Sequence, residues 1–405
     1  MKIRSITCFC NPYIHRQPLI PAILRDLNQN LRGAFEQANF EVQTTRLATV
    51  PFKDYFYQKN IDECIACALS LEKQAHEMEF DYLCLGPLTP ITEQVVEIIP
   101  SILAATKDVF LSAVIAKHGL PINLEIINNT AKIIKANAII SADGFENLRF
   151  AALANVQAFT PFFPAAFSEG NALAFSLAME CADEAIDAFQ QTSDAEEALQ
   201  ILLNHLESTA QTLQSIAEKV GGKYKAIFKG FDFSLAPFPK DECSLGKALE
   251  MLAPEKLGYS GSLFASALLA GALDRGKWKK AGFNGLMLPV LEDSILAQRT
   301  KEGTLDIYDL LMYSAVCGTG LDTIPLAGDI KVEDLQSLLL DIAALALRLD
   351  KPLTARLMPI PGKQAGDETQ FQFDYFANGK VLSYKASTLS GLLKSSKAVH
   401  IYKRK

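Results

Sequence analysis

The sequence predicts an α/β protein with about ten main strands, and three observations carry that prediction. Apolar runs rich in β-branched and aromatic residues alternate with runs of helical periodicity over residues 1–140. Glycine and proline mark the ends of such runs, as at Gly86-Pro87. Hydrophobic residues make up 49% of the chain and charged residues 21%, which supplies a large core and excludes general disorder. Strands interleaved with helices predict a large α/β barrel or a doubly wound sheet.

The first 140 residues show the clearest alternation of strand and helix patterns. The expected strands are 3–9, 40–47, 80–85 and 109–116, and the expected helices are 21–37, 61–78, 92–105 and 128–140. Each apolar run of β character is followed by one helical run, which is the order of strand-helix units.

The rest of the chain keeps the alternation with interruptions. Two apolar runs at 149–155 and 162–167 predict neighbouring strands, and the Ala-, Glu-, Gln- and Leu-rich stretch 171–220 predicts long helices. Further strands are expected at 224–235, 286–291 and 353–359, and further helices at 245–252, 263–273 and 335–349. Alternating aromatic residues around an Asn378-Gly379 turn predict a C-terminal β-hairpin. We expect one large domain over 1–405, with 366–405 as a hairpin extension.

Composition limits the classes of binding partner and the cellular compartment that we expect for this protein. The net charge of −7 supplies no field that attracts phosphate backbones, so no nucleic-acid binding is expected. The longest uncharged segment, 150–168, contains Pro161 and Pro164, so no membrane helix is expected. The apolar run at the N-terminus is too short for an export signal, and the eight cysteines lie mostly in apolar surroundings. These features suit a cytoplasmic protein with reduced thiols.

The stretch 282–329 is the first candidate site, because polar residues follow a buried strand there. Glu292 and Asp293 stand at the end of the strand predicted over 286–291, where barrels place their chemistry. Together with Asp232 and Asp322 they form a candidate set of general acids and bases or of oxygen ligands for a divalent ion. The alternative is that Asp293 caps the helix that begins at Ser294 and that Glu292 is solvated.

Arg356 is the candidate cation of the site. It lies in the middle of the apolar strand 353–359, where a charged side chain needs a partner. It can pair with Asp322, or it can bind an anionic substrate through two parallel hydrogen bonds. An internal ion pair is the favoured interpretation.

Two glycine-containing loops complete the candidates. Cys317 precedes two glycines, whose backbone N–H groups can lower the pKa of a thiol, although a helix cap with a small buried cysteine is the favoured alternative. Ser260, Gly261 and Ser262 open a helix whose free N–H groups can hold a phosphate or a carboxylate. No zinc site is predicted, because the cysteine pair in 64–67 lacks a second ligand pair, and no residue is assigned as a metal ligand beyond the alternative given above for the carboxylates. The sequence does not identify a cofactor.

Several segments together resemble an uncharacterised family known as a domain of unknown function. They are 3–7, 149–155, 232–239, 285–293, 317–329 and 354–363. The resemblance covers nearly the whole chain and implies a fold similar to pyruvate formate-lyase, which is a ten-stranded barrel of two five-stranded halves with a loop through its interior. Cys317 to Gly320 is the candidate for that loop.

The sequence departs from the glycyl-radical enzymes of that fold. It contains neither an Arg-Val-(Ser/Thr)-Gly-Tyr type of motif for the radical glycine nor a Cys-Cys pair. We therefore expect no glycyl-radical chemistry. The leading hypothesis is an enzyme that acts on a small anionic metabolite inside the barrel, and the competing hypothesis is a non-catalytic protein that binds or senses a small molecule. A homo-oligomer is expected in either case.

Overall fold

The computed structural model describes residues 1–14, 17–51, 53–56, 59–316, 318–385 and 388–404. Within these residues nine strands form one sheet in the order β8-β7-β1-β2-β3-β4-β6-β10-β9. Its neighbours are parallel except where β1 meets β7 and where β6 meets β10. The strands are β1 (Lys2–Cys10), β2 (Val42–Thr49), β3 (Tyr82–Cys84), β4 (Val109–Ala116), β6 (Phe150–Ala154), β7 (Ala174–Glu180), β8 (Ile227–Ala236), β9 (Gly320–Ala327) and β10 (Leu353–Ile360).

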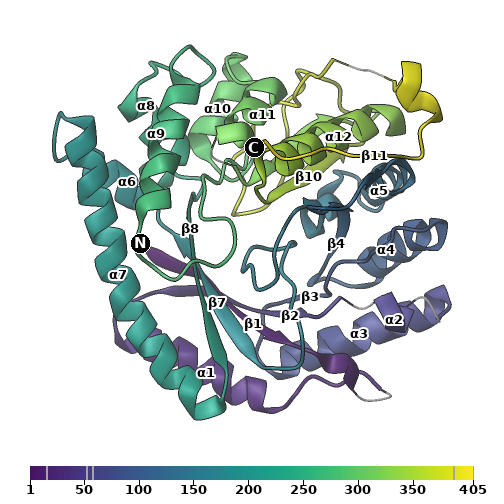
Figure 1. The fold of residues 1–405 in the computed structure, drawn as a ribbon, viewed down its shortest axis with the longest axis horizontal. Helices are drawn as coiled ribbons and strands as arrows, with labels where there is room; N and C mark the ends of the chain where they lie inside the picture. Colours follow the sequence, from purple (N-terminus) through teal and green to yellow (C-terminus); the bar gives the residue numbers. More distant parts are fainter. Residues whose placement is uncertain (15–16, 52, 57–58, 317, 386–387, 405) are drawn as a thin grey trace.

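The helices lie around the outside of this strongly curved sheet (Figure 1). Those of the described residues are α1 (Ile23–Gln37), α2 (Lys53–Phe56), α3 (Ile61–Glu77), α4 (Glu93–Ala105), α5 (Leu124–Ala138), α6 (Ala182–Phe189), α7 (Ala195–Tyr224), α8 (Leu245–Leu252), α9 (Ser262–Arg275), α10 (Ser294–Glu302), α11 (Ile307–Val316) and α12 (Val332–Leu349). Short 3₁₀ helices span Pro12–Ile14, Phe145–Arg149, Asp241–Cys243 and Gly391–Ser395. No helix in these ranges is long and apolar enough to cross a membrane.

Alternation along each strand separates an outer core from an inner face, because successive side chains point to opposite sides of a sheet. In β8, Phe231, Phe233 and Leu235 belong to the large core shared with the helices. Asp232 and Ser234, which alternate with them, line a cavity on the other face. The inner face is therefore where polar side chains can meet a ligand.

The segment 155–173 between β6 and β7 lies on this inner face. Phe163 packs there with Phe9 of β1 and Cys84 of β3. Phe162 packs with Leu153 of β6. In Figure 1 the segment is the blue-green loop within the curve of the sheet. A chain segment thus fills part of the interior.

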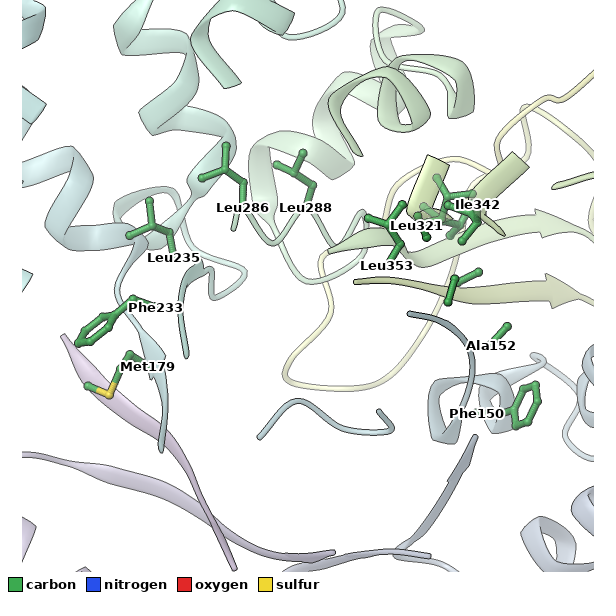
Figure 2. Close-up of a cluster of buried hydrophobic side chains, with 14 of the residues drawn as sticks. Phe150, Ala152, Met179, Phe233, Leu235, Leu286, Leu288, Leu321, Ile342 and Leu353 are labelled. Atoms are coloured by element: carbon green, nitrogen blue, oxygen red, sulfur yellow. The ribbon is translucent and has the colours of Figure 1, made fainter. Parts of the chain in front are cut away.

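The segment 286–290 lies between the ends of the sheet, β8 and β9. The Met287 N–H donates to the Ser234 carbonyl of β8 at 2.9 Å. Leu286 and Pro289 form single parallel bridges with Gly318 and with Asp322 of β9. Figure 2 shows the side chains of Leu286 and Leu288 between Leu235 on one side and Leu321 and Leu353 on the other.

The early strands and helices confirm the sequence prediction, and the middle of the chain corrects it. The expected strand 162–167 is wrong, because this segment makes no strand and lies inside the sheet. The expected helix from residue 171 is wrong at its start, because 174–180 is β7, paired with both β1 and β8. The glycine-containing loop expected after residue 317 is instead β9, a strand whose eight residues are all buried.

The C-terminal region also differs from the prediction. No two-residue turn forms at Asn378-Gly379, because backbone bonds join 366–369 to 379–381 and leave the aromatic residues between them in a loop. The Asn378 side chain bonds both the N–H and the carbonyl of Phe371, at 2.8 and 3.1 Å. Further along, β11 (Ala398–Val399) pairs with β5 (Ile122–Asn123). The aromatic loop between residues 369 and 379 places Phe373 and Tyr375 at the cavity on the inner face of the sheet.

Candidate active-site cavity

One cavity on the inner face collects residues from most of the strands. It encloses about 840 Å³ of space between atoms, including its opening to solvent. Its walls combine charged, polar, aromatic and aliphatic side chains. They are Arg4, Gln43, Thr44, Arg46, Tyr82, Phe110, Leu148, Pro161, Phe162, Phe163, Ala178, Met179, Asp232, Ser234, Ala236, Met287, Glu292, Arg356, Phe373 and Tyr375.

Strand alternation aims the charged side chains inward. In β10, Ala355 and Leu357 belong to the outer core, so Arg356 between them points to the cavity. In β2, Thr44 and Arg46 are two residues apart and line the cavity together.

Irregularities of the strands lie next to the same side chains. The pairing of β1 with β7 shifts between Ile3 and Ser5, so Arg4 is the extra residue of a bulge. The pairing of β10 with β9 shifts beside Arg356, where β9 holds one residue more and Thr323 adopts a φ of 44°. Leu235 in the irregular part of β8 has a φ of 47°. Bulges redirect side chains and are enriched beside active sites, as are non-glycine residues with positive φ.

Three charged side chains of the cavity wall form one buried ion-pair network with Asp322 of β9, which is not itself a wall residue. The Nε of Arg356 donates to Asp322 Oδ1 at 2.6 Å, and its Nη2 donates to Glu292 Oε1 at 2.7 Å. The second oxygen of Glu292 accepts from Nη2 of Arg4. Arg356 and Glu292 are each 4% exposed and Asp322 is fully buried. Breaking such a network from one side leaves an uncompensated buried charge.

The pKa values of Asp322 on β9 and Arg356 on β10 are both raised, for different reasons. Burial, opposed by the charge of Arg356 and reinforced by that of Glu292, raises the pKa of Asp322. The Oδ2 atom of Asp322 is buried without a hydrogen-bond partner. The pKa of Arg356 is raised because the attraction of Asp322 and Glu292 outweighs the burial of the guanidinium.

Arg46 is the cation of the cavity that the network leaves out. Its Nε donates to Thr44 Oγ1 at 3.0 Å, and in the described part of the chain it makes no other hydrogen bond and no ion pair. Its guanidinium carbon lies 5.8 Å from the ring centre of Tyr82 and 5.3 Å from that of Phe163. Burial, together with the charges of Arg4 and Arg356, lowers the pKa of Arg46 to about 10, so the side chain is still a cation at neutral pH.

Asp232 lines the cavity while holding the turn that leads into 286–290. Its carboxylate accepts from the backbone N–H groups of Phe283 at 2.9 Å, Asn284 at 3.1 Å and Ser234 at 3.1 Å. Gly282 has a φ of 80°, and a Cβ there would stand 2.3 Å from Asp232 Oδ2. Burial raises the pKa of Asp232, against the effect of these hydrogen bonds.

The other sequence-predicted residues lie outside the cavity walls. Asp293 is fully buried and caps α10, accepting from the N–H groups of Ile295 and Leu296 at 3.0 Å each. The capping role is the first part of the alternative raised from the sequence, and the second part, a solvated Glu292, is wrong because Glu292 is buried in the ion-pair network. Ser260, Gly261 and Ser262 lie at the N-terminus of α9, with Ser262 bonded to the Tyr259 carbonyl. Cys317 falls outside the described residues.

The structure therefore brings together Glu292, Asp322, Arg356 and Asp232, and it separates them from Asp293. Sequence reasoning missed Arg4 and Arg46. Each is a charged residue within an expected strand, as Arg356 is, although only Arg356 has mainly apolar neighbours. Among the described residues no group of three or more histidine, cysteine, aspartate or glutamate side chains is arranged to hold a metal ion.

Comparison with known proteins places the chain in a family. A family model described as "Uncharacterised ACR (DUF711)" matches residues 1–378. The chain belongs to this family. The match extends from β1 through the cavity loop that carries Phe373 and Tyr375, so every residue of the cavity lies within it.

Curated relatives resemble the chain over most of its length. A UPF0210 protein of Caldicellulosiruptor saccharolyticus is 28% identical over 375 residues, which is 86% of this chain and 80% of the relative. A UPF0210 protein of Oenococcus oeni is 27% identical over 343 residues, covering 80% of this chain and 76% of the relative. A UPF0210 protein of Pyrobaculum arsenaticum is 31% identical over 269 residues, covering 64% and 58%.

Proposed function

We propose that this protein binds a small organic anion in the cavity, and that Arg46 holds the charge of that anion. The observation that carries the proposal is the pairing of the three cavity arginines. Arg4 and Arg356 face carboxylates, whereas Arg46 has none within the described residues. A half-buried guanidinium that makes no ion pair favours an anionic ligand, and its planar donors match a carboxylate.

Arg4 and Arg356 are already paired with carboxylates, so they do not compete with Arg46 for the charge of the ligand. Arg356 and Arg4 share Glu292, and Arg356 also holds Asp322. Ion pairs largely compensate the charges of Arg4 and Arg356, so Arg46 is the arginine of the cavity wall whose charge no ion pair compensates within the described residues. This arrangement favours a singly charged ligand over a multiply charged one.

Calorimetric titration of small monocarboxylates and inorganic phosphate tests the proposal. We expect at least one monocarboxylate to bind the wild-type protein and Arg46→Met to weaken that binding about tenfold to a hundredfold, since a hydrogen bond to a charged group contributes about 1.5–3 kcal/mol. Methionine keeps the apolar stem and removes the charge. The control is Arg32→Met, which changes an exposed arginine paired with Glu36 on α1.

Equal affinity in wild type and Arg46→Met would contradict the assignment of Arg46. Unfolding of both variants by heat separates a loss of binding from a loss of folding. We expect both variants to show a small and similar change in melting temperature. Only Arg46→Met should lose ligand binding.

A second candidate function is acid-base catalysis on the same anion. One observation favours it: Asp232 is an ionisable group of the cavity wall that makes no ion pair within the described residues, and burial raises its pKa. A raised pKa brings a carboxyl closer to the range in which it both gives and takes a proton at neutral pH. Mass spectrometry of the bound ligand after incubation would reveal turnover, and turnover should be lost in Asp232→Asn.

The barrel similar to pyruvate formate-lyase is also a proposal. The pairing of Leu286 and Pro289 with β9, and the bond from Met287 to β8, support 286–290 as the element that joins the two ends of the sheet. Side-chain alternation supports it too, because Leu286, Leu288 and Val290 belong to the outer core while Met287 lines the cavity. The threading segment of such a barrel would be 155–173, in place of the Cys317 loop expected from the sequence.

A further inference from the structure

We propose that the ligand class of this cavity is the flat aromatic monocarboxylates. This rests on the proposed function and makes it more specific. The carboxylate binds Arg46, and the aromatic ring lies against the rings that surround that guanidinium. Three features of the cavity lead to this class.

The first feature is the density of aromatic residues. Six of the twenty residues that line the cavity are aromatic, against 9% of the whole chain. Aromatic side chains bury large areas in fixed orientations and contact a second ring through its edge or its face. A cavity walled in this way binds a flat ring better than it binds an extended polar chain.

The second feature is the position of three of these rings relative to Arg46. Tyr82 and Phe163 both contact its guanidinium, at 5.8 and 5.3 Å from the ring centres. Phe110 contacts Tyr82 and Phe163 in edge-to-face geometry, with ring centres 5.4 and 5.3 Å apart. The three rings form one continuous surface that begins at the cation. A ring bonded directly to a carboxylate on Arg46 would therefore lie beside them.

The third feature is charge. Arg356 pairs with Glu292 and Asp322, and Arg4 pairs with Glu292 while its Nη1 lies 3.7 Å from Glu180. A doubly charged phosphate at Arg46 would find no second uncompensated cation among the described residues of the cavity. A carboxylate needs one, so the charges favour the carboxylate.

The remaining walls agree with an apolar ligand body. The wall also includes aliphatic groups such as Leu148, Met179 and Met287. Met287 and Phe162 belong to one inner apolar cluster. The cavity wall thus combines a cation with apolar surface, which are the two groups that an aromatic acid requires.

Calorimetric titration of the full-length protein with four probes tests the class. The probes are benzoate, cyclohexanecarboxylate, acetate and inorganic phosphate. Benzoate and cyclohexanecarboxylate have the same charge and nearly the same size, and they differ in flatness. We expect benzoate to bind about threefold to tenfold tighter than cyclohexanecarboxylate, because one or two ring-ring contacts add that much affinity. We expect phosphate to bind more weakly than benzoate.

A variant of the aromatic surface sharpens the test. Phe110→Leu keeps an apolar side chain and removes the ring that joins Tyr82 and Phe163. It should reduce the preference for benzoate over cyclohexanecarboxylate while leaving the affinity for acetate unchanged. The comparison of benzoate with cyclohexanecarboxylate needs only the wild-type protein, so the proposal stays testable if the variant fails to fold.

The outcomes separate this inference from the proposed function. Anions that bind through Arg46 with no preference for benzoate would overturn the aromatic class and leave the anion site standing. Phosphate bound most tightly would also overturn the class. If none of the four probes binds, the aromatic class is wrong, and failure of every other small anion as well would remove the anion site.

Discussion

Replacing Arg356 by alanine is expected to lower the free energy of unfolding by about 3–5 kcal/mol at pH 7. The substitution leaves Asp322 fully buried with neither oxygen paired, since its Oδ2 already lacks a partner. It also removes one of the two arginines that bond Glu292. The measurement is equilibrium unfolding in urea, monitored by circular dichroism.

An exposed arginine supplies the matched control. Arg32 pairs with Glu36 at 3.1 Å on the surface of α1, with both side chains at least 40% exposed. Such pairs contribute about 0–1 kcal/mol, so Arg32→Ala should change stability little. A loss in Arg356→Ala no larger than that in Arg32→Ala would contradict the importance of the buried network.

The cost of Arg356→Ala should become smaller as the pH falls. Burial already raises the pKa of Asp322 in the native protein, and loss of the Arg356 charge raises it further. The folded variant therefore takes up a proton at a higher pH than the folded wild type. Proton uptake by the folded state stabilises it relative to the unfolded chain, so the difference in stability shrinks toward acid pH. A constant difference between pH 7 and pH 5 would contradict this assignment.

Replacing Asp293 by alanine is expected to lower the free energy of unfolding by about 2–4 kcal/mol. Its Oδ1 accepts from Ser244 Oγ at 2.6 Å and from two N–H groups of α10, and its Oδ2 accepts from the Gly246 N–H at 3.1 Å. One carboxylate thus joins the starts of α8 and α10. The alanine variant leaves these donors buried without an acceptor.

Two further variants separate capping from simple loss of a charge. Asp293→Asn keeps one acceptor oxygen and should recover part of the lost stability, because burial disfavours the charged form and raises the pKa of Asp293. Asp194 caps α7 at the surface through one bond to Glu197 N at 2.9 Å, so Asp194→Ala should cost only about 1 kcal/mol. If Asp293→Ala and Asp194→Ala cost the same by urea unfolding, the bridging role of Asp293 is wrong.

Strands with strong local patterns could be predicted from the sequence. Residues 109–116 have the same bounds in the prediction and in β4, because their apolar β-branched residues carry the strand preference themselves. β7 was missed because its sequence, with Ala, Leu, Met and Glu, favours a helix locally. Its place between β1 and β8 overrides that preference.

The inner segment and β9 needed information that no local pattern contains. Residues 162–167 have the composition of a strand, but Pro161 and Pro164 interrupt the backbone N–H groups that pairing requires. The glycines around Gly320 predict a loop, yet a Cβ at Gly320 would lie 2.0 Å from the Thr354 carbonyl oxygen of the neighbouring strand. The glycine therefore permits close strand pairing.

Part of the candidate site could be predicted from the sequence, and the rest depends on contacts between distant strands. The sequence favoured an ion pair of Arg356 with Asp322, and the structure contains it. Glu292 joins this pair although it is 64 residues from Arg356 in the chain. Arg4 and Arg46 were missed because their inward orientation depends on sheet pairing and, for Arg4, on a bulge. Such geometry arises only when distant strands meet.

A crystal structure of the protein soaked with 4-iodobenzoate tests the central claim most directly. The iodine marks the ligand by anomalous scattering, so its position does not depend on interpreting weak density. We expect the iodine signal inside the cavity, with the carboxylate of the ligand within about 3 Å of the Nη atoms of Arg46. An ordered ligand at another place on the protein, with the cavity unchanged and Arg46 bound only to Thr44, would contradict the account.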